Sequence, residues 1–126
     1  MVIDCNDPRA QEKWWSEALD WKLILETDNE YVIIPSWVDE ATMRAIPREH
    51  IGPGIVFIQE RKPKTIKNRL HIDLAPQAGN DHGAEVARLE KLGARRIDIG
   101  QPQDVSWTVL ADPEGNEFCV LSSQTP

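Results

Sequence analysis

The sequence lacks several features that would place it quickly in a class of protein. No apolar run approaches the roughly 20 residues that span a bilayer, so a transmembrane helix is not expected. The start of the chain lacks a basic segment followed by an apolar one, and we therefore expect no signal peptide. The only two cysteines, Cys5 and Cys119, are too few for a disulfide framework. We expect both to be reduced thiols in a cytoplasmic protein.

Positive charge is also scarce in this sequence. The chain has 14 lysines and arginines against 21 aspartates and glutamates, which gives a formal net charge of −7. An acidic surface repels phosphate backbones and anionic lipids, so nucleic acid and membranes are poor candidates as partners. The remaining composition, 40% hydrophobic and 28% charged over 126 residues, is typical of one globular domain with a core.

The most informative stretch lies near the end of the chain, at residues 110–121. Its Asp112-Pro-Glu-Gly115 segment has the residues that a type I turn favours, and apolar runs typical of strands lie on both sides. The pattern predicts a β-hairpin. On its second strand, Glu117 and Cys119 share one face because side chains alternate along a strand. Either both point into a cleft, or Glu117 faces solvent and Cys119 lies in the core.

The first half of the chain is predicted to form a strand, a helix and three further strands. Asp7 is a favourable N-cap and Pro8 a favourable first helical residue, so we expect a helix over residues 8–19. An apolar stripe that includes Ala10, Trp14 and Ala18 indicates its buried face. The predicted strands are residues 2–5, 21–26, 31–34 and 54–60.

Residues 36–53 do not fit a regular pattern. Residues 40–45 are compatible with one helical turn, but Pro47, Gly52 and Pro53 interrupt the rest of the segment. We therefore predict a long loop, and long loops in compact domains often cover a binding site.

The second half repeats the order of the first. A strand is predicted at residues 70–74 and a helix at residues 84–92, where Gly93 is a favourable helix end. Further strands are predicted at residues 95–99, 107–111 and 118–121. Residues 61–69, here called the basic segment, hold five of the fourteen basic residues. We interpret this segment as a solvated connector; an anion-steering patch beside a cleft is the alternative.

These patterns predict an α+β fold class built from two βαβββ modules. The modules would form one curved mixed sheet around a cleft, with the helices outside, because a module of this length buries its sheet face poorly alone. We expect a single domain over residues 1–126, with module one at about residues 1–61, a linker at residues 62–69 and module two at about residues 70–126.

Several stretches together resemble a known family. The most specific is residues 104–121, and the supporting stretches are residues 3–8, 14–21, 67–74 and 84–94. On these stretches the sequence resembles the glyoxalase-like branch of the vicinal oxygen chelate superfamily, the glyoxalase/bleomycin-resistance proteins. The resemblance implies paired βαβββ modules and a cleft for a small molecule, often built at a homodimer contact. It does not imply one reaction, because the fold hosts isomerases, dioxygenases, epimerases, thiol transferases and non-catalytic drug-binding proteins.

The resemblance also implies where a metal ion would bind. Metal-dependent members place one ligand on the first strand and one on the last strand of each module. Carried over to this sequence, the four positions hold His71, Cys119 in place of the usual glutamate, Ile58 or Gln59, and Val2 or the position before Met1. One good ligand does not hold a hard cation tightly, so we expect no metal cofactor. In the alternative, Glu117 joins His71 and Cys119 around a divalent metal.

We therefore interpret the chain as a metal-free, small-molecule-binding glyoxalase-like protein. Lyase or isomerase activity by acid–base chemistry stays open, as does a metal-dependent lyase, isomerase or dioxygenase that uses His71 and Glu117. A homodimerisation or interaction module is a third alternative. The candidate catalytic residues are His71 and Glu117, and the candidate ligand-binding residues are Gln59, Asp73, Trp107, Cys119 and, by symmetry with Asp73, Asp4.

Overall fold

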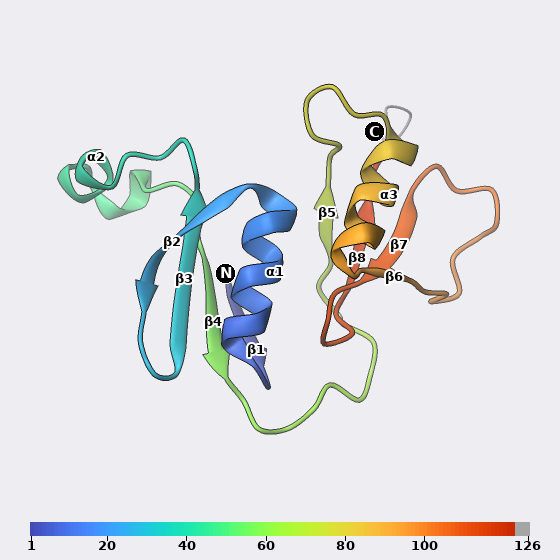
Figure 1. Cartoon of the computed structure of the whole chain (residues 1–126), viewed down its shortest axis with the longest axis horizontal. Helices are drawn as coiled ribbons and strands as arrows, with labels where there is room; N and C mark the ends of the chain where they lie inside the picture. Colours follow the sequence, from blue (N-terminus) through green and yellow to red (C-terminus); the bar gives the residue numbers. More distant parts are fainter. Residues whose placement is uncertain (123–126) are drawn as a thin grey trace. The chain divides into compact units, whose positions relative to one another are not determined.

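A computed structural model describes residues 1–122 and divides the chain into two compact units (Figure 1). The first unit is Met1–Pro63 and the second begins at Lys64, a boundary inside the predicted linker. Each unit contains a four-stranded mixed sheet and a long helix in the order βαβββ, which confirms the α+β fold class and the paired modules. The joining of the two sheets around one cleft stays a prediction.

The first unit is a mixed sheet with α1 against it. The sheet has the order β1-β4-β3-β2; β1 is parallel to β4, and the other pairs are antiparallel. In Figure 1 this unit runs from blue to green. Its elements are β1 (Val2–Cys5), α1 (Pro8–Leu19), β2 (Trp21–Glu26), β3 (Glu30–Pro35), α2 (Glu40–Ala45), the 3₁₀-helix η1 (Arg48–His50) and β4 (Ile55–Gln59).

Helix α1 begins and ends where the sequence predicts. The side chain of Asp7 accepts a hydrogen bond from the Ala10 amide at 3.0 Å, and Asp20 ends the helix in a left-handed conformation with φ 55°. Trp15 is buried, as the apolar stripe predicts. The inclusion of Ala10 in that stripe is wrong. Ala10 is exposed because the buried face passes through Gln11 instead.

Residues 36–53 correct the prediction of a long loop. The segment contains α2 and η1. Asp39 caps α2, because its carboxylate accepts hydrogen bonds from the Thr42 amide at 2.9 Å and from the Thr42 hydroxyl at 2.7 Å. This local cap gives six residues a helical conformation before Pro47 interrupts the chain. Helix α2 has no buried residue, so tertiary packing contributes little to it.

The second unit repeats the strand arrangement of the first. Its sheet has the order β5-β8-β7-β6, with β5 parallel to β8 and the other pairs antiparallel. The buried face of α3 includes Val86 and Leu89. The elements are β5 (Ile72–Leu74), α3 (His82–Leu92), β6 (Arg95–Arg96), β7 (Thr108–Ala111) and β8 (Glu117–Val120).

The predicted hairpin is present between β7 and β8. The Gly115 amide donates to the Asp112 carbonyl at 3.0 Å, which closes the β-turn. The Asp112 side chain is fully buried, and its Oδ1 accepts from the Glu114 and Asn116 amides, each at 2.9 Å. Asp112 therefore fixes the turn through its side chain as well as through its backbone.

Three boundaries in the second unit differ from the predicted ones. Helix α3 begins at His82, earlier than predicted, because Asp81 caps it by accepting from the Ala84 amide at 2.8 Å. Strand β5 begins only at Ile72, two residues later than predicted. Strand β6 ends at Arg96 instead of residue 99, and the following residues form a loop whose own side chains bind its backbone. In that loop, the Gly100 amide donates to the Asp98 carboxylate at 2.7 Å.

The described residues can be checked for a membrane-spanning helix and for a disulfide between the two cysteines. Within residues 1–122, no helix is both long and apolar enough to cross a membrane. Over the same residues, no disulfide joins Cys5 to Cys119; both are buried, in different units.

Candidate functional site

A pocket of about 510 Å³ lies within the second unit. This volume is in the range of small-molecule sites, which is about 300–1,000 Å³. Both polar and apolar side chains line it. Its lining residues are His71, Asp73, Ile99, Gly100, Gln101, Pro102, Trp107, Cys119 and Leu121.

The pairing of β5 with β8 brings three of the predicted site residues together. Asp73 is paired with Cys119 in the parallel register. His71 lies two residues before Asp73, so the alternation of side chains directs it to the same face. These three residues form the polar wall of the pocket.

The loop between β6 and β7 provides the mainly apolar part of the lining. Residues 99–102 and Trp107 belong to this connection. Trp107 was predicted to lie on a strand, but β7 begins one residue later, at Thr108. Trp107 is half-buried and contributes a large apolar surface to the pocket.

Cys119 is a buried thiol with a raised pKa. Burial is the largest cause, and the charge of Asp73 and a hydrogen bond with it raise the pKa further, while the charge of Lys67 lowers it. Cys119 is therefore protonated at neutral pH. A protonated thiol is a weak nucleophile and a weak metal ligand.

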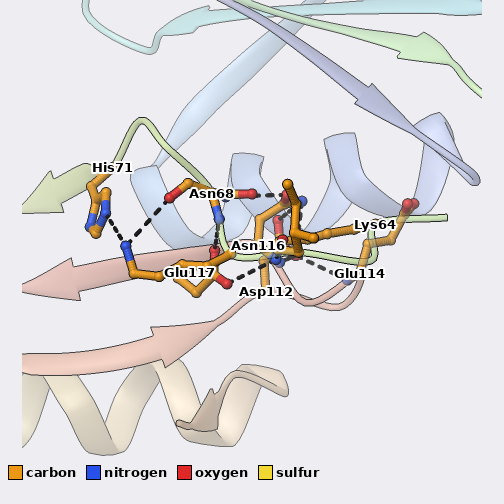
Figure 2. Close-up of polar contacts among 9 residues, drawn as sticks. Lys64, Asn68, His71, Asp112, Glu114, Asn116 and Glu117 are labelled. Carbon is orange, nitrogen blue, oxygen red and sulfur yellow. Dashed lines mark hydrogen bonds and ion pairs between the residues drawn. The ribbon is translucent and has the colours of Figure 1, made fainter. Parts of the chain in front are cut away.

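Glu117 shares a strand face with Cys119, but it is not among the lining residues of the pocket. Lys64 Nζ donates to its Oε1 at 2.8 Å, and the Asn68 amide donates to its Oε2 at 2.9 Å (Figure 2). Burial alone would raise the pKa of Glu117, but these hydrogen bonds outweigh burial and lower it. The buried carboxylate thus ties residues 64–68 to β8.

His71 has a lysine as its polar neighbour. Lys67 Nζ lies 2.9 Å from His71 Nε2. An ammonium group can only donate, so Nε2 accepts this hydrogen bond and the ring proton lies on Nδ1. Figure 2 shows His71 at one end of a hydrogen-bonded group of residues in which Glu117 lies between Asn68 and Lys64.

The donor set does not fit the metal site that the superfamily resemblance implies. His71 offers its Nε2 lone pair to Lys67, and Glu117 is engaged by Lys64. Two ammonium groups are thus hydrogen-bonded to the nitrogen and oxygen atoms that would have to bind a cation. Within residues 1–122, no three histidine, cysteine, aspartate or glutamate side chains are grouped to hold a metal ion.

Gln59 and Asp4 belong to the first unit, whereas the pocket is lined by residues of the second. Gln59 Nε2 donates to the Asn6 carbonyl at 2.6 Å. Asp4 is exposed and paired with Ile58 in the parallel register of β1 and β4. Their contact with a ligand in the second unit stays a prediction.

The sequence did not reveal the individual contacts of the lysines around this site. Lys64 and Lys67 belong to the basic segment, which was interpreted as a solvated connector, with an anion-steering patch beside a cleft as the alternative. The four-residue spacing of Lys67 and His71 resembles a helical pair, but no helix is present there, so spacing alone could not reveal the contact. A loop is predicted at residues 100–104, but the sequence did not indicate that it lines a pocket, and residue 99 was assigned to the preceding strand.

Comparison with known proteins agrees with this architecture. The family model of the glyoxalase-like domain matches residues 1–121. A search of curated protein sequences finds no match.

Solved structures with a similar fold cover almost the whole chain. FosX from Mesorhizobium loti, a fosfomycin resistance protein, has a TM-score of 0.65 at 14% identity, covering 99% of this chain and 89% of that one. A glyoxalase/bleomycin resistance protein/dioxygenase family enzyme from Burkholderia phytofirmans has a TM-score of 0.62 at 17% identity, with 95% and 93% covered. FosX from Listeria monocytogenes, in complex with Mn(II) and sulfate, has a TM-score of 0.66 at 10% identity, with 96% and 85% covered. At these identities the likeness shows the fold alone.

Proposed function

We propose that this chain, which belongs to the glyoxalase-like domain family, binds a small molecule in the pocket of its second unit without a metal ion. The observation that supports this proposal is the grouping of His71, Asp73, Cys119 and Trp107 around about 510 Å³. The polar groups can orient a ligand, and the indole can bury its apolar part.

The protonation of the pocket residues supports binding by hydrogen bonds. With Nε2 bonded to Lys67, His71 has Nδ1–H as its remaining donor. Asp73 is exposed and provides carboxylate oxygens as acceptors. A ligand with both an acceptor and a donor would satisfy both groups.

We further propose that the protein, besides binding the small molecule, acts on it as a lyase or isomerase by acid–base catalysis. His71 would exchange a proton with the ligand, and Asp73 is the carboxylate beside it on the same strand face. Glu117 enters this proposal as the group that fixes the segment holding Lys67, because both of its oxygens are engaged.

A metal-dependent reaction is the alternative, and Mn(II) in the Listeria FosX structure is what favours it. It would require Lys67 to leave His71 and Lys64 to leave Glu117. Elemental analysis of dialysed protein distinguishes the two. We expect no stoichiometric divalent metal, and about one metal ion per chain would contradict the metal-free proposal.

The direct test is a binding screen with small carbonyl and aromatic compounds. Binding is followed by ¹H–¹⁵N NMR at the indole of Trp107, which is identified by its loss in Trp107→Phe. We expect His71→Ala to weaken a confirmed ligand about tenfold, equivalent to about 1.4 kcal/mol. His50→Ala is the matched control, because His50 is an exposed histidine of the first unit. Equal affinity of the parent and His71→Ala would show that the site is wrongly placed.

A homodimer and a cytoplasmic location also belong to this proposal. Size-exclusion chromatography with light scattering checks the first, and cell fractionation checks the second.

A further inference from the structure

The charge of Lys67 is the feature that the proposed function leaves unused. Its ammonium group contacts His71 Nε2 at 2.9 Å and the Asn68 carbonyl at 3.4 Å. Among residues 1–122, no carboxylate lies within ion-pair distance of it, whereas Lys64 is paired with Glu117 at 2.8 Å. Lys67 is thus a positive charge beside the pocket whose partners are neutral.

We propose that the pocket binds a ligand with an anionic group, a carboxylate or a phosphonate, and that Lys67 holds this group beside His71. The inference rests on the proposed function and adds the chemical class of the ligand. A charge-assisted hydrogen bond to an anion is about twice as strong as one to a neutral group, so an anion is the favoured partner for the remaining Lys67 donor.

The position of Lys67 is fixed by its neighbours in the chain. Glu117 binds Lys64 and the Asn68 amide, and these two contacts flank Lys67 on both sides. The backbone that carries Lys67 is thus already ordered before a ligand binds, which lowers the entropic cost of binding there. Its field also reaches the wall of the pocket, because it counteracts the rise in the pKa of Cys119.

Asp73 limits where an anion can bind. Its carboxylate lines the pocket next to Cys119 and repels a second negative charge there. The anionic group therefore belongs on the Lys67 and His71 side, and an uncharged, apolar part belongs against Trp107. This arrangement favours a ligand with one negative end and one apolar end.

The test compares compounds that differ mainly in charge. Benzoate and phenylphosphonate are titrated against benzamide, a neutral compound of similar shape, with the Trp107 indole signal in ¹H–¹⁵N NMR as the readout. We expect both anions to bind at least about tenfold more tightly than benzamide in low salt. Added salt should reduce this preference, because it screens an exposed charge.

Three lysine variants assign the effect to one side chain. Lys67→Met should reduce benzoate affinity about tenfold and benzamide affinity by much less, because benzamide carries no charge for Lys67 to bind. Lys67→Arg should keep most of the preference for anions, because it keeps the charge. Lys62→Met is the matched control: Lys62 is an exposed lysine of the same basic segment and should not affect binding.

The outcomes separate this inference from the proposed function. If benzamide binds as tightly as benzoate, or if Lys67→Met binds benzoate like the parent, the anionic class is wrong and small-molecule binding stands. If no compound of either charge affects the Trp107 signal at millimolar concentration, while the broader screen finds ligands, the anionic class is again wrong. If the broader screen also finds none, both proposals are wrong.

Discussion

The two units have the same strand order but different chemistry at equivalent positions. In the first, the parallel register pairs Ile3 with Phe57; in the second, it pairs Ile72 with Phe118. Both phenylalanines are fully buried, so the apolar frame is shared. The next positions differ, because Asp4 is paired with Ile58 whereas Asp73 is paired with Cys119.

The long connections of the two units also lie in different places. The first unit has its long connection between β3 and β4, where α2 and η1 lie. The second unit has it between β6 and β7, and this loop provides Trp107 and residues 99–102 to the pocket. The buried apolar pairs that the two units share thus specify the fold. The loop between β6 and β7 and the pairing of Asp73 with Cys119 distinguish the pocket of the second unit.

The largest expected effect tests the shared frame. Phe57→Ala and Phe118→Ala should each lower the free energy of unfolding by about 3–5 kcal/mol, because each removes a fully buried ring. Urea denaturation followed by circular dichroism measures both. If only one variant is strongly destabilised, the two positions are not equivalent and the comparison fails.

The next largest effect is expected for the ion pair between Lys64 and Glu117 in the second unit. Glu117→Gln should lower the free energy of unfolding by about 2–3 kcal/mol, because it removes a charge that a buried site holds with two hydrogen bonds.

Glu90→Gln is the control for that measurement. Glu90 pairs with Arg96 at 3.0 Å in an exposed position, so we expect at most about 0.5 kcal/mol. Similar losses for the two variants would mean that Glu117 is not an anchor of the basic segment.

The same carboxylate makes stability depend on pH. The folded-state pKa of Glu117 is lowered, because hydrogen bonds from Lys64 and Asn68 outweigh the effect of burial. Its contribution is therefore complete above the unfolded-state pKa, about 4.3, and is lost as pH falls through the lower folded-state value. The difference in stability between the parent and Glu117→Gln should be constant near neutral pH and shrink in acid. A difference that grows in acid would contradict this.

The comparison with Glu117→Gln is needed because Glu85 also makes the stability of the parent depend on pH. Burial opposes the effect, but hydrogen bonds from Arg88 and Asn80 lower its pKa as well. Glu85 is present in both proteins, so its contribution cancels when the two stability curves are compared.

The fold could be predicted from local patterns. Asp7 accepts from the Ala10 amide and Asp112 accepts from the Gly115 amide. Both hydrogen bonds are short-range, so the sequence alone specifies the start of α1 and the hairpin turn. A helical turn at residues 40–45 was compatible with the sequence, but a loop was predicted because Pro47 and Gly52 follow and the segment has no apolar face.

The alternation of side chains along a strand predicted which site residues share a face, but it predicted no other contact of the site. Alternation indicated that His71 and Asp73 share a face, and the structure places both in one pocket with Cys119. It could not show that Lys64 lies against Glu117, because that contact joins residues 53 positions apart. The path of the basic segment depends on tertiary structure, which periodicity does not encode.

The smallest expected effect is on the reactivity of the Cys119 thiol, which lies where the first unit has Ile58. Burial raises the pKa of Cys119 most, and the charge of Asp73 and its hydrogen bond raise it further. Asp73→Asn removes that charge, so it should lower the pKa and increase the thiolate fraction at a given pH. We expect labelling of Cys119 by iodoacetamide to become about twofold to fivefold faster near pH 8, as measured by mass spectrometry of its peptide.

Two further variants test this prediction: one should have the opposite effect on labelling, and the other is a control. Lys67→Met should slow the labelling of Cys119, because the charge of Lys67 lowers the pKa of this thiol. Asp4→Asn changes the equivalent aspartate of the first unit, which is paired with Ile58, and should leave the labelling of Cys119 unchanged. Equal acceleration by Asp4→Asn and Asp73→Asn would mean that a general loss of stability exposes the thiol. Acceleration by Asp73→Asn alone would assign the effect to the register position that distinguishes the two units.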